Sequence, residues 1–312
     1  MEKLKVLFHT RDDSSYIVPA SHYFVKELTK STELKVSHES GHIEDIIAKS
    51  GIKPDFIYFN DYLENYSPVV TGLKTLKIPF AVGLHDLHFR YPDRKKFLLD
   101  ENIKYIFTYY RDKFLNWYPE FADQMVWLPH HVNTAIFKDY HLPKDIDMLL
   151  MGSTRAEVYP LRVSMLNRLQ HCPGFIHHTH PGYRKVSEKE QGVYVGESYA
   201  KELNRAKICL TCDSVFKYPL MKYYEITASN SLLLAPNSNE LMDLGFIPGV
   251  NFISINETNF EEKASYYLNH ENERRMISLN GMRLSHQKHS TGKRVNDFVI
   301  EIKKIIQRES ES

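Results

Sequence analysis

The stretch ICLTCDSVFKYPLMKYYEITASNSLLLAPNSNEL, residues 208–241, contains two apolar runs separated by a polar loop and a helical pattern. The runs 208–212 and 231–235 predict buried strands, and Pro219 suits the first turn of the helix between them, where no backbone donor is lost. Four apolar residues recur at helical spacing: Leu220, Met221, Tyr224 and Ala228. The stretch therefore predicts a strand–helix–strand unit of a parallel sheet.

The loop and the start of the helix carry the polar residues of this unit. Ligands of parallel α/β sheets bind at the carboxyl ends of the strands, which makes 213–218 a candidate binding loop. Lys222 and Glu225 are three residues apart, so they share a helix face near an N-terminus that attracts anions. A cation, a carboxylate and free amides suit a phosphorylated ligand rich in hydroxyl groups. An ordinary solvated Lys/Glu pair has the same spacing, so the pair alone leaves both interpretations open.

Three segments in the same order resemble the group 1 glycosyltransferases, especially the branch typified by spore maturation protein CgeB. The segment 223–255, YYEITASNSLLLAPNSNELMDLGFIPGVNFISI, resembles that family's helix with a donor-binding Glu and the strand after it. The segment 196–210 resembles the preceding helix and strand, and 145–169 resembles the opening strand, Gly-Ser turn and Arg-bearing helix. Asn230 stands where the family usually has Gly, so we expect a left-handed Asn there.

The resemblance implies the GT-B fold, in which two Rossmann-like, doubly wound α/β domains face a cleft. We expect an N-terminal acceptor domain over 1–135, a donor domain over 136–290 and a helix over 291–312 that crosses back to the N-terminal domain. The loop 9–16 after the first strand is not rich in glycine, so the first half lacks a dinucleotide-binding fingerprint.

The order of elements agrees with parallel sheets, because strand-like and helix-like segments alternate in both halves. In the first half we expect strands at 5–9, 34–37, 55–59, 80–84, 105–109 and 125–128, and helices at 21–29, 42–49, 69–76, 94–99 and 113–118. In the second half we expect strands at 146–151, 175–178, 208–210, 232–234 and 252–255.

Composition excludes several classes of protein. Forty basic and 39 acidic residues leave a formal charge of +1, so no global field recruits nucleic acid or an anionic membrane. No segment approaches ~18 apolar residues and the N-terminus lacks a signal-peptide core, so we expect a cytoplasmic protein without a transmembrane segment.

Cysteines and histidines give no sign of a disulfide framework or a metal site. Cys209 and Cys212 lie inside an apolar strand, and we interpret them as core residues. The sequence contains 16 histidines, but no Cys, Asp or Glu cluster completes a ligand set with them. We therefore expect no metal and no other cofactor.

The chemistry implied by the resemblance is transfer of a hexosyl group from a nucleoside diphosphate, with a UDP-sugar as the expected donor. The acceptor is a hydroxyl of a glycan, a protein or a small molecule, and the lineage favours retention at the anomeric carbon. The leaving diphosphate gains charge that cations and helix amides must stabilise. We expect Arg155, after the Gly152–Ser153 turn, and Lys222 in this role. Arg162 is a weaker candidate, because its position also suits the outer face of its helix.

Three further roles follow from the resemblance or from strand position. The resemblance places Glu225 at the ribose hydroxyls and Tyr194 beside the base, although Tyr194 also suits a half-buried strand position. His85 and Asp86 follow the buried strand 80–84 in the segment PFAVGLHDLHF, which resembles the family more weakly. We expect them to be catalytic residues that face the donor sugar across the cleft. The alternative is that Asp86 caps the next turn and His85 packs beneath it.

Two other functions are compatible with the same fold. A non-catalytic protein that binds nucleotide-sugars would have lost the charged site residues, and these are present here. A nucleotide-sugar epimerase would need acid and base residues on both walls of the cleft, and would convert the donor without an acceptor.

Overall fold

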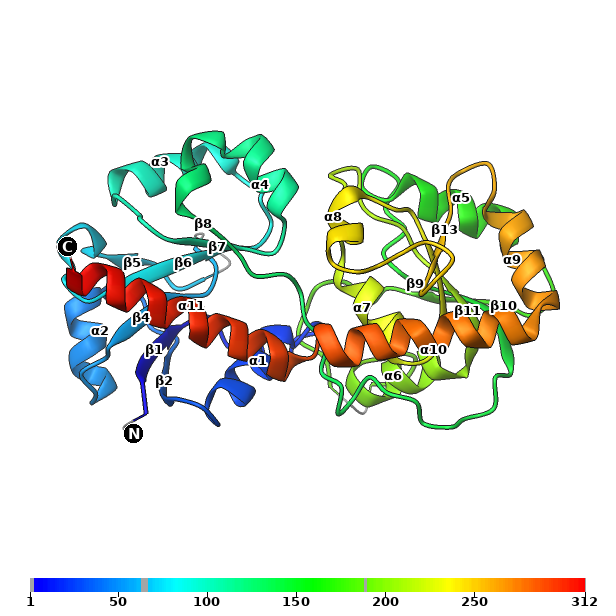
Figure 1. Ribbon diagram of the computed structural model, residues 1–312, viewed down its shortest axis with the longest axis horizontal. Helices are drawn as coiled ribbons and strands as arrows, with labels where there is room; N and C mark the ends of the chain where they lie inside the picture. Colours follow the sequence, from blue (N-terminus) through cyan, green and yellow to red (C-terminus); the bar gives the residue numbers. More distant parts are fainter. Residues whose placement is uncertain (1–2, 63–66, 188–189, 312) are drawn as a thin grey trace. The chain divides into compact units, whose positions relative to one another are not determined.

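The computed structural model of the chain describes residues 3–62, 67–187 and 190–311, and it contains two compact units (Figure 1). The N-terminal unit comprises Met1–Ser14, Ala20–Pro129 and Gly292–Ser312. The C-terminal unit comprises Ser15–Pro19 and His130–Thr291. We expected the first domain boundary after residue 135, and in the structure the chain passes from the N-terminal to the C-terminal unit after Pro129.

The N-terminal unit is built on a six-stranded sheet in the order β2-β1-β4-β6-β7-β8, parallel throughout. Its strands are β1 (Lys5–His9), β2 (Glu33–Ser37), β4 (Phe56–Phe59), β6 (Phe80–Leu84), β7 (Ile106–Thr108) and β8 (Met125–Trp127). A separate pair joins β3 (Gly41–His42) to β5 (Val70–Thr71). The direction of winding reverses between β1 and β4, which makes the carboxyl ends of these two strands the switch point of the sheet.

The helices of this unit are α1 (Ala20–Leu28), α2 (Ile43–Ser50), α3 (Tyr91–Asp100), α4 (Arg111–Trp117) and most of α11 (Thr291–Glu311), with 3₁₀ turns η1 (Leu73–Thr75) and η2 (Pro119–Gln124). Figure 1 shows α11, the red helix, alongside β1 and β4. Val295, Phe298, Ile302 and Ile305 of α11 belong to the same buried cluster as Phe8 of β1. The last helix therefore packs on the N-terminal sheet, as the resemblance implied.

The C-terminal unit contains a five-stranded parallel sheet in the order β10-β9-β11-β12-β13. Its strands are β9 (Ile146–Gly152), β10 (Phe175–Thr179), β11 (Ala206–Leu210), β12 (Leu232–Ala235) and β13 (Ile253–Ser254). Its helices are α5 (Pro160–Leu169), α6 (Gly196–Arg205), α7 (Met221–Ala228), α8 (Asn239–Asp243), α9 (Phe260–Asn269) and α10 (Glu271–Lys288). Here the winding reverses between β9 and β11.

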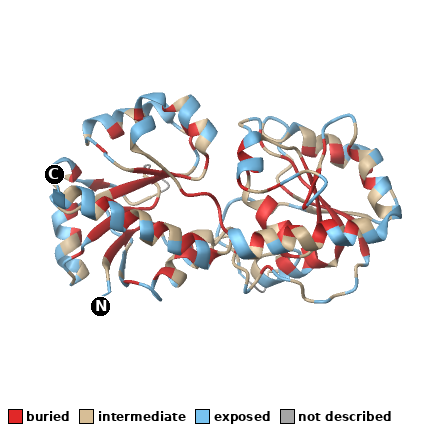
Figure 2. Cartoon of the chain, viewed as in Figure 1, coloured by how far each residue is buried: buried red, intermediate tan, exposed pale blue. Residues whose placement is uncertain are grey.

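Burial explains why the stretch 208–241 has two continuous apolar runs. Every residue of β12 is fully buried, and β11 is buried except for Lys207 (Figure 2). Parallel strands covered by helices on both faces are apolar at every position and do not alternate with polar residues. The predicted α/β class with two parallel sheets is thus confirmed.

Two local predictions were wrong. Residues 69–76 contain the strand β5 and the short 3₁₀ turn η1 in place of an α-helix, because Gly72 takes a left-handed φ of 84° and Val69, Val70 and Thr71 favour an extended chain. The helix α7 begins at Met221 with Leu220 as its N-cap, so Pro219 lies before the helix and not in its first turn.

Two other local predictions were confirmed. Asn230 is left-handed, with a φ of 55°. Cys209 and Cys212 are buried free thiols, and burial raises their pKa values to about 12 and about 11 respectively.

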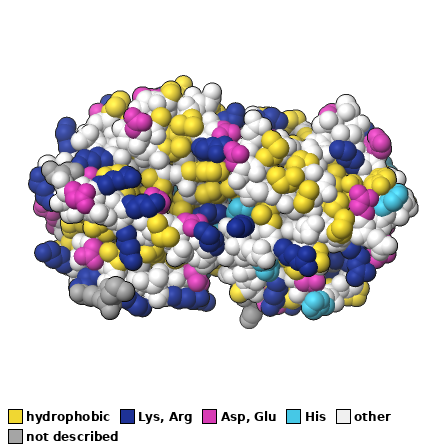
Figure 3. Space-filling view, in the orientation of Figure 1, with side chains coloured by type: hydrophobic (Ala, Val, Ile, Leu, Met, Phe, Trp, Pro, Cys, Tyr) yellow, Lys and Arg dark blue, Asp and Glu magenta, His cyan; other side chains and the backbone are white. Residues whose placement is uncertain are grey.

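The surface carries both signs of charge. Figure 3 shows basic and acidic side chains interspersed over the face in view, as expected for a formal net charge of +1. Within the described part of the chain, no helix is both long enough and apolar enough to cross a bilayer.

Candidate functional site

Most of the predicted donor residues meet at the switch point of the C-terminal sheet. Gly152 ends β9, and Thr211 and Cys212 directly follow β11, the neighbouring strand. Ligands of parallel α/β sheets bind at such a reversal, because the loops leave the two strands in opposite directions.

Arg162 joins the two loops of this switch point. Its Nη1 donates to the carbonyl of Ser153 at 2.7 Å, and its Nη2 donates to Thr211 Oγ1 at 3.2 Å and to the carbonyl of Cys212 at 3.1 Å. The residue is only 1% exposed, so the expectation that it suits the outer face of α5 was wrong. All three acceptors are neutral, and no described carboxylate lies within ion-pair distance of the guanidinium. A buried cation without a counter-ion can attract an anionic ligand.

Lys222 approaches the same position from α7. A Cβ atom built on Gly152 would lie 2.8 Å from Lys222 Cε and 3.1 Å from Arg162 Nη1. The two cationic side chains therefore converge on the space that a side chain at position 152 would fill. Burial and the nearby Arg162 lower the pKa of Lys222 to about 8, although Glu225 acts in the opposite direction. Repulsion between the two cations would be relieved by a bound anion.

Glu225 lies one turn further along α7 and is linked to Lys222 through a tyrosine of α6. Lys222 Nζ donates to Tyr199 Oη at 2.9 Å, and Tyr199 Oη donates to Glu225 Oε2 at 3.2 Å. Burial raises the pKa of Glu225, against the influence of Lys222 and of this hydrogen bond. The carboxylate is half-buried, and only one of its oxygens takes part in this bond.

His180 also borders the switch point. It directly follows β10, whose last residue Thr179 is the register partner of Gly152. Its Nδ1 accepts a hydrogen bond from the backbone N–H of Gly182 at 3.0 Å, so the neutral ring carries its proton on Nε2. Burial, with further contributions from Lys222 and Arg162, lowers the pKa of His180 to about 4. The imidazole is therefore a neutral donor at pH 7.

Among the described contacts, none joins Arg155 or Tyr194, the remaining predicted donor residues, to this group. Arg155 is exposed in the turn after β9, and its backbone carbonyl accepts from the N–H groups of Val158 and Tyr159. Tyr194 lies beside β10, where its ring centroid is 4.3 Å from that of His178. The structure thus brings together Gly152, Ser153, Arg162, Lys222 and Glu225.

Sequence reasoning missed two residues of the group. His180 could have been found, because it comes directly after a predicted strand, at a carboxyl end. No pattern in the sequence identifies Tyr199, since its contacts depend on how α6 packs beside α7.

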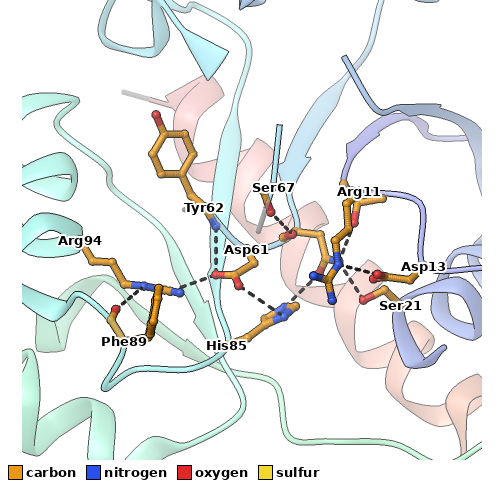
Figure 4. Close-up of polar contacts among 11 residues, drawn as sticks. Arg11, Asp13, Ser21, Asp61, Tyr62, Ser67, His85, Phe89 and Arg94 are labelled. Carbon is orange, nitrogen blue, oxygen red and sulfur yellow. Dashed lines mark hydrogen bonds and ion pairs between the residues drawn. The ribbon is translucent and has the colours of Figure 1, made fainter. Parts of the chain in front are cut away.

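The N-terminal unit has a second polar cluster at the carboxyl ends of its strands (Figure 4). His85 follows β6, and its Nε2 lies 3.1 Å from Asn60 Oδ1. The amide nitrogen of Asn60 donates to Thr10 Oγ1 at 3.0 Å and to Ser21 Oγ at 2.9 Å. Both amide hydrogens are therefore used, so the Asn60 oxygen accepts the proton of His85 Nε2.

Asp61 faces the other nitrogen of His85. Its Oδ2 lies 4.0 Å from Nδ1, and its Oδ1 pairs with Arg94 Nη1 at 2.9 Å. Burial lowers the pKa of His85. Burial would raise the pKa of Asp61, but Arg94 and His85 outweigh it and hold that pKa below its ordinary value.

Asp86 is exposed, and its backbone carbonyl accepts from the N–H of Phe89 at 3.0 Å. Among the described residues, the carboxylate within ion-pair distance of His85 is that of Asp61, which we did not single out from the sequence. Among the residues that the structure describes, no three His, Cys, Asp or Glu side chains are arranged to hold a metal ion.

A chain with two Rossmann-like units has the components of the GT-B fold, and solved structures with this fold resemble the chain along almost its whole length. HepE of Anabaena, in complex with UDP and glucose, has a TM-score of 0.62 at 10% identity, covering 96% of this chain and 100% of that chain. A glycosyltransferase from Rickettsia africae has a TM-score of 0.64 at 11% identity, covering 98% and 99%. A Listeria monocytogenes protein described as a UDP-N-acetylglucosamine 2-epimerase has a TM-score of 0.54 at 14% identity, covering 98% and 97%. At these identities the likeness shows the fold.

The sequence itself matches one family. Residues 162–299 match the family described as glycosyl transferase-like, and this range contains Arg162, Lys222 and Glu225. No curated protein sequence matches the chain. The family match supports the resemblance to glycosyltransferases, while the branch typified by CgeB stays a prediction.

Proposed function

We propose that the protein is a glycosyltransferase whose C-terminal unit binds a nucleoside diphosphate-sugar, with a UDP-sugar as donor. The observation that carries the proposal is the convergence of Arg162 and Lys222 on Gly152, with no described carboxylate paired to the guanidinium. A diphosphate is the anion that suits two cations at the switch point of a parallel sheet. The family match over 162–299 supports the same activity, and the UDP bound by HepE supports the choice of base.

Each residue of the group has a distinct role in this proposal. Arg162 and Lys222 stabilise the charge that develops on the leaving diphosphate, and the nearby α7 N-terminus contributes in the same direction. Glu225 accepts hydrogen bonds from the ribose hydroxyls. Tyr194 packs against the base, and Arg155 reaches the phosphates from its exposed turn.

The two cations can supply the positive charge that the leaving group requires, so we propose that transfer proceeds without a metal ion or another cofactor. A hexosyl group is the proposed cargo, and retention at the anomeric carbon is the proposed outcome. His85 and Asp86 stay predicted catalytic residues. Their replacement by alanine should lower kcat by ~10²-fold and leave the UDP affinity unchanged.

The experiment is release of UDP from a panel of UDP-sugars, followed with and without EDTA. We expect UDP to appear with at least one donor, at a rate that EDTA does not change. Lys222→Met should lower this rate by ~10²-fold and weaken uridine binding much less, because the charge builds up only as the bond breaks. Lys201→Met is the control, since Lys201 is an exposed lysine of α6 that pairs with Glu197. Loss of the activity with EDTA and its return with Mg²⁺ would contradict the metal-free mechanism.

Epimerization is the second candidate, because the Listeria protein described as an epimerase shares the fold. An epimerase converts one UDP-sugar into another and requires no acceptor. Chromatography of the same reactions distinguishes the two activities. Transfer or hydrolysis releases UDP, whereas epimerization changes the sugar while it stays attached to UDP. A new UDP-sugar peak would favour the epimerase.

A further inference from the structure

Lys222 and Glu225 have opposite charges on the same face of α7, and they do not pair directly. Residues three apart on a helix are within reach of each other, and a Lys and a Glu at this spacing commonly form an ion pair. The described ion pairs include several at three- and four-residue spacing, but not this one. Tyr199 Oη lies between the two groups instead, 2.9 Å from Nζ and 3.2 Å from Oε2.

The tyrosine hydroxyl uses one hydrogen of the ammonium and one oxygen of the carboxylate, and leaves their remaining hydrogen-bonding capacity for a ligand. It accepts one hydrogen from the ammonium, which has three, and it donates its own hydrogen to one carboxylate oxygen. The aromatic ring adds a cation–π contact, with Nζ 4.8 Å from the ring centroid. The ring of Phe137 packs edge-on against Tyr199 at 5.7 Å between centroids, which helps to fix its orientation.

We propose that Tyr199 is a positioning residue of the donor site, which holds Lys222 toward the diphosphate and Glu225 toward the ribose and prevents the two from pairing with each other. The proposal rests on the proposed function, because it assigns the two groups to two parts of one nucleotide. It goes beyond that function by giving a role to a residue that need not touch the donor.

Removal of the hydroxyl should redirect Lys222. In Tyr199→Phe the ammonium loses its acceptor, and the nearest opposite charge is Glu225 on the same helix. A direct ion pair would occupy both groups, so pyrophosphate and uridine should each bind about tenfold more weakly. Tyr140→Phe is the matched control, because its half-buried hydroxyl donates to the carbonyl of Ile136 at 2.7 Å and lies in the same unit.

A double variant separates positioning from a general structural effect. Glu225→Gln removes the charge with which Lys222 would pair. In this background Tyr199→Phe should change pyrophosphate affinity by less than about twofold, whereas in the wild-type background it should weaken binding about tenfold. Equal losses in both backgrounds would overturn the proposal.

The pH dependence of UDP affinity gives an independent readout. The charged or titratable groups that influence Lys222 or lie beside it come from four elements and one loop: Glu225 of α7, Arg162 of α5, Cys209 of β11, Tyr199 of α6 and His180 after β10. The pKa of Lys222 is about 8, whereas the pKa values of His180 and Cys209 are about 4 and about 12, so Lys222 is the member of this group that titrates near pH 8. UDP affinity should fall as the pH rises through about 8. In Tyr199→Phe the direct ion pair raises the pKa of Lys222, so the fall should move to higher pH.

Titration calorimetry at pH 7 to 9 decides between the outcomes. A weaker Kd with a displaced pH profile in Tyr199→Phe, and neither change in Tyr140→Phe, is the expected result. An unchanged Kd and profile would overturn the role of Tyr199 and leave the proposed function intact. Absence of UDP binding in the wild-type protein would instead overturn the proposed function, and this inference with it. Loss of folding in Tyr199→Phe would also contradict it, because a positioning residue leaves the fold unchanged.

Discussion

Gly152 combines an unusual backbone conformation with a close approach of two charged side chains. Its φ of 123° is strained for any residue with a side chain, and a Cβ atom would lie within 3.1 Å of both Lys222 and Arg162. The glycine at the end of β9 therefore gives the space in which the cations converge.

Gly152→Ala should reduce UDP affinity at least ~10-fold, because the methyl group occupies that space and displaces Lys222 or Arg162. It should also lower the melting temperature, since the strained backbone costs of order 1–3 kcal/mol. Gly249→Ala is the control: its φ is 78°, and a Cβ atom there would have no neighbour within 4 Å. The control should lose stability and keep its nucleotide affinity. Normal UDP binding by Gly152→Ala would show that binding does not depend on the placement of Lys222 and Arg162 beside this glycine.

Single residues also show how far the sequence could predict the site. Lys222 and Glu225 could be identified from helical spacing and the strand before them, which are local features. The sequence could not show that Arg162 and not Arg155 lies in the group, because this depends on which face of α5 packs against the loops after β9 and β11. Asp61 was missed for the same reason: its relation to His85 follows from the adjacency of β4 and β6 in the sheet.

The helix α11 is the clearest case of an apolar pattern whose packing partners lie far away in the sequence. Phe298 is fully buried, and its ring lies 5.0 Å from that of Tyr58, 5.3 Å from that of Phe24 and 5.4 Å from that of Phe107. The helical spacing of the apolar residues of α11 predicted a helix with one buried face. The family resemblance was needed to predict that this face packs on the N-terminal unit. The helix predicted over 69–76 was wrong because a three-residue apolar pattern occurs in both short strands and helices. The left-handed Gly72 prevents a continuous helix there.

Phe298→Ala should destabilise the N-terminal unit by ~3–5 kcal/mol, because it removes an aromatic ring from a closed core. Differential scanning calorimetry should show the loss as a lower melting temperature for the transition of that unit. Ile300→Ala on the same helix is the control, since Ile300 is 43% exposed and its truncation should cost far less. Equal effects of the two substitutions would contradict the packing of α11 on the N-terminal sheet.

Both units have polar groups at the carboxyl ends of parallel strands, and both contain histidines that are partly or fully buried. Burial lowers the pKa of five histidines, three in the N-terminal unit and two in the C-terminal unit: His9, His85, His88, His177 and His180. These rings stay neutral in the folded protein at pH values where the unfolded chain already binds protons.

Stability should therefore fall on mild acidification. The folded-state pKa of each ring lies below the unfolded value of about 6.5, so the unfolded state takes up protons first as the pH falls through 6.5. Melting temperatures should decrease from pH 7.5 to pH 5.5, and His180→Gln should make the decrease shallower. A melting temperature that is constant or rises over this range would contradict the assignment of these histidines as neutral groups in the folded protein.

Diphosphate binding by the C-terminal unit is the property on which the proposed function rests, and calorimetric titration of the wild-type protein with UDP and with uridine tests it. Two charge-assisted contacts, from Arg162 and Lys222, contribute ~1.5–3 kcal/mol each, so UDP should bind at least ~100-fold more tightly than uridine at pH 7. Equal affinities for UDP and uridine, or no binding of either, would contradict a diphosphate site at Gly152.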